Sequence, residues 1–263
     1  MNLFESIILG LVQGLTEFLP VSSSGHLSLF SNFLGQADED LLFELLLHLG
    51  TLLAVFIVFW KKILDITLGL FKGEKEAIHY TLMVVLASIP TAAIGFTFEK
   101  KVAFLSTQPL VVCSLLFLMG IALYSTKKAP AVNHDNPITW GQALIIGTLQ
   151  GVAILPGISR SGSTITTALW LKVDRKAAGE FSFLMSIPVI GGACLLKIKD
   201  AVEAGIIGDS LQIIPISGVA VSFVSGLISL VYLMKFIQKG KLYQFAYYLW
   251  PVSILGFIYF VFQ

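Results

Sequence analysis

Two stretches of the chain decide its fold: QGLTEFLPVSSSGH at residues 13–26 and QGVAILPGISRSGST at residues 150–164. Each lies inside a longer apolar segment, residues 3–34 and 138–172, and interrupts it with Pro, Gly and Ser. Each half of an interrupted segment is too short to cross a bilayer, so both segments are predicted to be re-entrant helix–loop–helix hairpins. Such backbone is tolerated at membrane depth only when it is buried in protein or lines a wet cavity.

Composition places the chain in a membrane. Of its 263 residues, 56% are hydrophobic and 13% are charged, whereas an ordinary soluble domain carries roughly 25% charged residues. Six predominantly apolar runs are near the ~20 residues that a helix needs to cross a bilayer. They cover residues 41–60, 78–98, 107–126, 177–196, 213–234 and 242–262. The sequence thus predicts an all-α integral membrane protein with six transmembrane helices and two re-entrant hairpins, and its net charge of +1 offers no basic surface for nucleic acid.

The two interrupted segments are related by an internal repeat. With an offset of 137, six residues of the first recur in the second without a gap, and they are Gly10, Gln13, Gly14, Ser22, Ser24 and Gly25. An odd number of predicted crossings separates the hairpins, so the second enters the bilayer from the opposite face. The chain, residues 1–263, is therefore predicted to be one membrane domain with inverted-topology repeats at 1–126 and 138–263.

Positive charges predict the orientation. At the ends of the predicted crossings, 12 Lys and Arg residues fall on one side, while the other side receives 4, namely Lys100, Lys101, Lys197 and Lys199. Because cytoplasmic loops carry the excess of positive charge, the richer side is predicted to face the cytoplasm. Both termini and the mouth of the first hairpin then face outward.

The first stretch carries an acid, an imidazole and hydroxyls at predicted membrane depth, where each ionisable group is a functional hypothesis. Gln13 and Glu17 lie four residues apart on one helix face, ahead of the serine run at residues 22–24. Hydroxyls at the start of a helix suit an anion, although the serines alone would more simply cap that helix. Glu17 and His26 favour a site, because capping needs neither an acid nor an imidazole.

The second stretch carries a permanent cation. Arg160 is set among hydroxyl side chains at the predicted start of a helix, which is how a phosphate is commonly held. The alternative is an intramembrane ion pair with Glu17 or Glu44. If the two hairpins meet at the midplane of the bilayer, the acid, imidazole, hydroxyls and guanidinium converge in one cavity, and such a set suits phosphoryl transfer.

Three further ionisable residues lie within the predicted crossings. Glu44 and His48 share one helix face, and Glu180 stands near the equivalent place in the second half. These residues either support the groups of the cavity or form purely structural pairs.

The paired motifs closely resemble those of the undecaprenyl-diphosphate phosphatase family of bacteria, the bacitracin-resistance type, and the resemblance runs over nearly the whole chain. It implies a multi-pass enzyme of the bacterial cell membrane that hydrolyses undecaprenyl diphosphate to undecaprenyl phosphate and inorganic phosphate. That reaction recycles the lipid carrier for cell-wall synthesis and confers resistance to bacitracin, which competes for the lipid. The resemblance also implies a divalent cation, Mg²⁺ or Ca²⁺, bound by Glu17 and partly by the phosphates of the substrate.

Carried over position by position, the resemblance assigns the reaction to four residues. The expected catalytic residues are Glu17, Ser23, His26 and Arg160, and the expected substrate-binding residues around them are Gln13, Ser22, Ser24, Ser159, Ser161 and Thr164. Gln13 stands where many members have Glu, which leaves Glu17 as the principal acid. Whether Ser23, His26 or water attacks the phosphorus stays open.

The leading alternative function is a transporter or flippase of polyprenyl phosphate, because inverted repeats with broken helices also build transporters. Fold alone does not separate the two. An acid, an imidazole and a serine next to an anion-binding arginine are more chemistry than a carrier needs, and this favours the enzyme.

Overall fold

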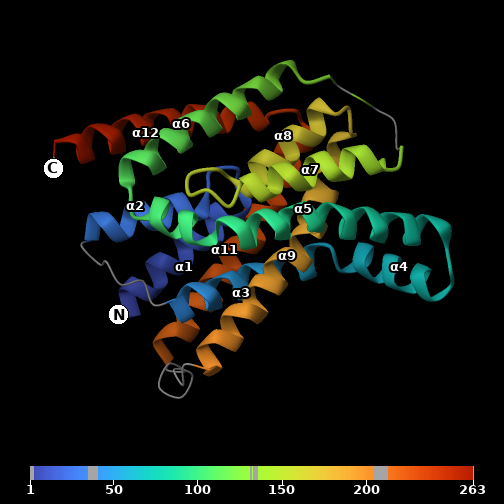
Figure 1. Ribbon diagram of the computed structural model, residues 1–263, viewed down its shortest axis with the longest axis horizontal. Helices are drawn as coiled ribbons and strands as arrows, with labels where there is room; N and C mark the ends of the chain where they lie inside the picture. Colours follow the sequence, from blue (N-terminus) through green and yellow to red (C-terminus); the bar gives the residue numbers. More distant parts are fainter. Residues whose placement is uncertain (1–2, 35–40, 131, 133–135, 204–212, 263) are drawn as a thin grey trace.

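The computed structural model describes residues 3–34, 41–130, 132, 136–203 and 213–262. Among these residues every regular element is a helix, as the sequence predicts (Figure 1). The elements, in chain order, are α1 (Leu3–Phe18), α2 (Ser23–Leu34), α3 (Leu41–Val58), α4 (Trp60–Phe71), α5 (Lys75–Ser106), α6 (Pro109–Ser125), η1 (Thr126–Lys128), α7 (Trp140–Val152), α8 (Arg160–Trp170), α9 (Arg175–Glu203), α11 (Ile213–Gln238), η2 (Leu242–Phe245) and α12 (Ala246–Val261).

Five helices are each long and apolar enough to cross a bilayer, and they coincide with five of the predicted crossings. They are Lys75–Ser106, Pro109–Lys128, Arg175–Lys199, Ile216–Gln238 and Leu242–Val261. The remaining crossing, predicted at residues 41–60, is α3, which reaches the necessary length only together with α4, and these two helices are bent by 72° at a short break. The chain is therefore a multi-pass helical membrane protein whose described residues hold five spans, or six if α3 and α4 form one broken span.

Each of the two interrupted segments folds as two helices joined by a turn, with the breaks between α1 and α2 and between α7 and α8. Each turn contains a left-handed residue, Ser22 with φ of 70° and Gly157 with φ of 96°. The Ser22 hydroxyl accepts the N–H of Gly25 at 3.2 Å and that of Gly157 at 3.1 Å. Ser159 caps α8 in the same way, by accepting the N–H of Gly162 at 3.1 Å. One serine thus caps its own helix and ties the two turns together in space.

Each interrupted segment packs against a long helix through glycine. The helix α1 lies along α11, and α7 lies along α5 (Figure 1). A Cβ on Gly14 would overlap the Ser225 hydroxyl of α11, and a Cβ on Gly147 would overlap the backbone oxygen of Ala87 of α5. At this close approach Thr91 donates to the carbonyl oxygen of Gly147 at 2.8 Å. Small residues at helix interfaces allow this kind of packing in membranes, where the hydrophobic effect does not drive helices together.

The core fixes the end of α1. Phe18 is fully buried, and its ring meets that of Phe183 from α9 edge to face, with ring centroids 5.7 Å apart. Phe183 in turn stacks on Phe59 at 6.0 Å. The outward surfaces are apolar instead, with Phe96 of α5 68% exposed and Leu255 of α12 67% exposed, as expected for surfaces that contact lipid. The rigid contacts of Phe18 therefore hold Glu17, its neighbour in sequence, at a defined place inside the bundle.

Candidate active site

A cavity of about 260 Å³, called the pocket below, lies where the two interrupted segments meet α3, α5 and α9. Its polar lining comes from both segments and from these three helices, and consists of Glu17, Ser22, Ser23, Ser24, Glu44, His48, Thr91, Gln150, Ser159, Arg160 and Lys197. Its apolar lining consists of Leu45, Ala153, Ile154, Ile158, Val189, Ile190, Ala193 and Cys194. A cavity with apolar walls and convergent polar groups is typical of a small-molecule site.

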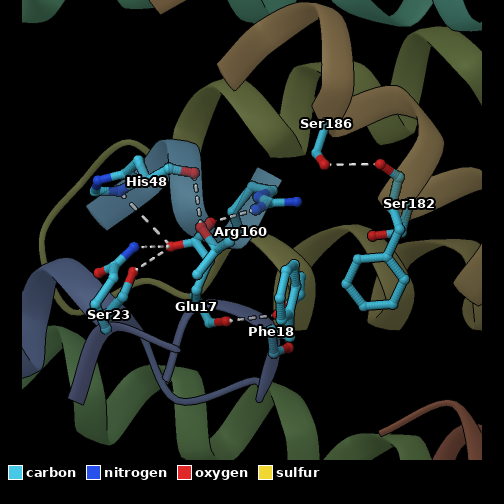
Figure 2. Close-up of polar contacts among 12 residues, drawn as sticks. Glu17, Phe18, Ser23, His48, Arg160, Ser182 and Ser186 are labelled. Carbon is cyan, nitrogen blue, oxygen red and sulfur yellow. Dashed lines mark hydrogen bonds and ion pairs between the residues drawn. The ribbon is translucent and has the colours of Figure 1, made fainter. Parts of the chain in front are cut away.

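Glu17 is the centre of the polar contacts in the pocket (Figure 2). Its side chain is 7% exposed, and its Oε1 accepts from Nη2 of Arg160 at 2.5 Å. Its Oε2 accepts from the Ser23 hydroxyl at 2.7 Å and from Nε2 of Gln13 at 3.1 Å. Nε2 of His48 lies 3.7 Å from the same oxygen. The structure thus brings the acid and the hydroxyl together with the guanidinium, which lies 143 residues after Glu17 in the sequence.

The ion pair with Glu17 uses only part of the Arg160 head group. Arg160 is the first residue of α8 and follows the capping Ser159. Its Nη1 is buried and has no hydrogen-bond partner in the described part of the chain. A guanidinium nitrogen left free at a helix N-terminus is a strong donor for an anion. The ion pair, which was the alternative to anion binding, is present, and Nη1 has no partner among the described residues.

The predicted hydroxyl groups divide into two sets. Ser22, Ser23, Ser24 and Ser159 line the pocket, whereas the other two hydroxyls, those of Ser161 and Thr164, are fully buried outside its lining.

The second set holds α8 in place. Ser161 donates to the carbonyl oxygen of Phe18 at 2.7 Å. Thr164 donates to the carbonyl oxygen of Arg160 at 2.9 Å and contacts the Ser182 hydroxyl of α9 at 2.5 Å. These two residues therefore fasten α8 to α1 and α9, and the structure does not place them with the pocket.

His26 also lies outside the lining of the pocket, although it was predicted among the reacting groups. It is 5% exposed, and its Nδ1 lies 2.8 Å from the carbonyl oxygen of Ser22. Because a carbonyl only accepts, Nδ1 carries the proton, and in the neutral ring Nε2 accepts from the Tyr248 hydroxyl of α12 at 2.9 Å. The two rings are stacked with centroids 5.7 Å apart. Both ring nitrogens of His26 thus have protein partners, the Ser22 carbonyl and the Tyr248 hydroxyl.

The three further ionisable residues also separate. Glu44 and His48 of α3 line the pocket. Glu180 does not, and instead lies 3.8 Å from Nζ of Lys62 and 3.7 Å from Nζ of Lys176. Glu180 therefore forms structural ion pairs outside the pocket. Glu44 and His48 instead lie in the pocket, together with Glu17 and Arg160.

Sequence reasoning missed three residues. Lys197 was interpreted only as a mark of the membrane edge, yet it lines the pocket and its Nζ lies 3.8 Å from Glu44. Gln150 lines the pocket and donates to Thr91 at 3.1 Å. It is the counterpart of Gln13 at the offset of 137, so the repeat could have identified it. No pattern distinguished Tyr248 from the other aromatic residues near the membrane surface, because its role depends on the packing of α12.

The pocket can hold a divalent cation only with help from a ligand. Glu17 and Glu44 are the carboxylates in its lining, and the described residues contain no group of three His, Cys, Asp or Glu side chains arranged for a metal ion. Mg²⁺ is commonly bound through one or two carboxylates together with the phosphates of a substrate. The residues present fit a cation bound in that way.

Comparison with known proteins identifies a family to which the chain is similar. A family model described as bacitracin resistance protein BacA matches residues 6–255. The chain is 42% identical to an undecaprenyl-diphosphatase of Halothermothrix orenii over 257 residues, which cover 97% of both chains. It is 41% identical to an undecaprenyl-diphosphatase of Desulfatibacillum aliphaticivorans over 270 residues, which cover 96% of this chain and 97% of the relative. These similarities therefore extend over almost the full length of each protein.

Proposed function

The chain belongs to the bacitracin resistance protein BacA family and is an undecaprenyl-diphosphatase, and we propose that its reaction takes place in the pocket. It hydrolyses undecaprenyl diphosphate to undecaprenyl phosphate and inorganic phosphate, which recycles the lipid carrier for cell-wall synthesis. The observation that supports this location is the double contact of Glu17, with the Ser23 hydroxyl on one oxygen and the Arg160 guanidinium on the other.

Ser23 is the nucleophile in this proposal. Its hydroxyl lines the pocket and donates to Glu17 at 2.7 Å, which is the arrangement of a nucleophile beside its base. The Ser23 oxygen forms a bond to the terminal phosphorus, and Glu17 takes the hydroxyl proton. The bond from that phosphorus to the bridging oxygen breaks, and undecaprenyl phosphate leaves with the electron pair. Water then attacks the phosphoserine, the serine oxygen takes its proton back from Glu17, and inorganic phosphate is released.

Arg160 supplies the positive charge for the transferred group. In phosphoryl transfer the charge is spread over the outer oxygens of the phosphoryl group, so positioning and neutralisation account for most of the catalysis. The free Nη1 of Arg160 donates to one of these oxygens, and the hydroxyls of Ser22, Ser24 and Ser159 donate to others. Gln13 lies outside the lining and acts through its hydrogen bond to Glu17, which orients the carboxylate.

His26 acts as a positioning residue. Its ring connects the Ser22 carbonyl to the Tyr248 hydroxyl, with 2.8 Å and 2.9 Å contacts on its two nitrogens. Ser22 has the left-handed backbone conformation of the turn, and Ser23 follows it directly. The ring therefore fixes the turn that presents the nucleophile, and its nitrogens are not available to attack phosphorus.

A divalent cation, Mg²⁺ or Ca²⁺, belongs to the same proposal. Glu17 and the oxygens of the two phosphates would hold it, in the way that Mg²⁺ usually meets a phosphate substrate. When bound, it would neutralise charge on the diphosphate.

The membrane architecture in this proposal is an inverted duplication with two re-entrant hairpins, at residues 3–34 and 138–172. The packing supports it, because α1 of the first repeat lies along α11 of the second, just as α7 of the second lies along α5 of the first. Both termini and the mouth of the pocket face outward, which agrees with the charge count and with the presence of Lys197, an outward-side lysine, in the pocket. There the enzyme and bacitracin compete for the same lipid diphosphate.

Phosphate release by the purified protein in detergent tests the reaction and its location, because hydrolysis needs no sealed membrane and transport does. The wild-type protein should release phosphate, and Ser23→Ala should not. Ser114→Ala is the matched control, since Ser114 is exposed on α6 and its hydroxyl contacts only its own helix among the described residues. A wild-type protein that releases no phosphate but moves polyprenyl phosphate across a vesicle membrane would support the transporter or flippase instead.

A further inference from the structure

A second ion pair lies in the pocket, apart from the pair of Glu17 and Arg160. Nζ of Lys197 is 3.8 Å from Oε2 of Glu44, and both residues line the pocket. The Lys197 side chain is 40% exposed and that of Glu44 is 24% exposed, against 15% and 7% for Arg160 and Glu17. The second pair is therefore the more accessible one, at a separation beyond hydrogen-bond reach.

The helix α3 connects the two pairs. His48 faces Glu17 at 3.7 Å, and Glu44 precedes His48 by four residues, which is one helical turn or about 6 Å along the axis. The two carboxylates thus lie between the two cations, in the order Arg160, Glu17, Glu44 and Lys197. Both cations line the same cavity of about 260 Å³, which suits a ligand with more than one anionic group.

The wall of α9 leads from this second cation to an apolar surface. Val189, Ile190, Ala193 and Lys197 all line the pocket, and their spacing places them on one face of α9. A ligand held at Lys197 can therefore rest an apolar tail on the same helix.

On the basis of the proposed function, we infer that Lys197 binds the phosphate that stays on the lipid, while Arg160 binds the phosphate that is transferred. The charges of the two pairs sum to zero, so the pocket has no excess positive charge for a diphosphate. The diphosphate must therefore displace a carboxylate from one of the two cations. The exposed pair exchanges at lower cost, because an ion pair in contact with water contributes little, whereas separating a buried pair is expensive. Glu44 is then a competitor that occupies Lys197 until the lipid arrives.

Inhibition by the two products tests this assignment, because each product occupies one subsite. Undecaprenyl phosphate carries the retained phosphate, and inorganic phosphate is the transferred one. Lys197→Gln is expected to raise KM and the inhibition constant of undecaprenyl phosphate about tenfold, the usual effect of losing one charged hydrogen-bond donor. It should leave kcat and the inhibition constant of inorganic phosphate within about twofold of the wild-type values, because Lys197 does not contact the transferred phosphate. Loss of a whole charged interaction would instead change them about tenfold.

Glu44→Gln provides the opposite change. It frees Lys197, so KM and the inhibition constant of undecaprenyl phosphate are expected to fall. Lys199→Gln is the matched control, because Lys199 lies on the same helix and pairs with Glu203 at 3.7 Å, outside the lining of the pocket. Lys197→Arg keeps the charge and should restore the affinity that Lys197→Gln loses, which separates loss of binding from loss of folding.

Two results would overturn the assignment. One is an active Lys197→Gln variant whose inhibition by undecaprenyl phosphate is unchanged, or changes equally for both products. The other is a Glu44→Gln variant that loses affinity as Lys197→Gln does, which would make the pair purely structural. Failure of the proposed location of the reaction would look different, because Ser23→Ala would then still release phosphate.

Discussion

Replacing Arg160 by lysine separates the ion pair with Glu17 from the binding of phosphate. Lysine keeps a positive charge beside the carboxylate, which is 7% exposed and needs a partner. It presents one nitrogen on a flexible chain, however, whereas arginine presents several in a rigid planar fork. The variant therefore cannot fill the position of Nη1, the nitrogen that has no partner in the described part of the chain. Activity should fall much further than stability.

The sizes of the two effects follow from this geometry. Removing one preorganised donor to a charge that develops in the transition state costs about 100-fold to 1000-fold in kcat, or about 2.7–4 kcal/mol. Arg160→Lys is expected to lose about 100-fold, the lower end of that range. Arg160→Ala removes the whole head group and leaves Glu17 buried without its cation, which lowers the free energy of unfolding by about 3–5 kcal/mol. The alanine variant should be inactive and unstable, and the lysine variant should be about 100-fold slower but folded.

The assay measures phosphate release and thermal unfolding on the same detergent-purified samples. Arg175→Lys is the matched control, because it makes the same substitution at a half-buried arginine outside the lining of the pocket. It should keep wild-type kcat and melting temperature. The reasoning fails if Arg160→Lys turns over at the wild-type rate, or if it unfolds as readily as Arg160→Ala.

Three further predictions address positioning, packing and orientation. Tyr248→Phe removes the donor to Nε2 of His26 and is expected to lower kcat several-fold with KM unchanged. A wild-type kcat in this variant would contradict the positioning role of His26. Gly147→Ala forces a methyl group against the backbone of α5 and should lower the melting temperature, whereas Gly95→Ala, with open space around it, should not, and equal effects would contradict the packing argument. A cysteine in place of the exposed Lys128, in a background without native cysteines, should react with a membrane-impermeant thiol reagent only from the cytoplasmic side; reaction from outside would reverse the orientation.

The sequence determined the fold class and both breaks, because these depend on local composition. Apolar runs of spanning length predicted five helices that the structure contains, and the Pro, Gly and Ser clusters marked both turns. The bend between α3 and α4 was not predicted, because no Pro or Gly marks it, and Val58, Phe59 and Trp60 read as one continuous apolar run. The crossing predicted at 78–98 lies within a longer helix, because α5 begins at Lys75 and continues past Lys100 and Lys101 to Ser106.

The site was predicted only where the motif itself faces the pocket. The contact among Glu17, Ser23 and Arg160 follows from two turns that meet. His26 was predicted among the reacting groups because it is an imidazole in the interrupted stretch and matches the histidine of the family motif, but its ring packs against Tyr248 of α12. Lys197 was missed because its place depends on the packing of α9 against α3, which no local pattern contains.

The central claim is that Ser23 takes the phosphoryl group of the lipid diphosphate in the pocket. A single turnover with substrate labelled in its terminal phosphate tests it most directly, with acid and alkaline quenches in parallel, since phosphoserine survives acid and phosphohistidine survives base. We expect a label on the Ser23 peptide after the acid quench, and neither label nor turnover in Ser23→Ala. A label on His26, turnover by Ser23→Ala at the wild-type rate, or turnover without any adduct would contradict it.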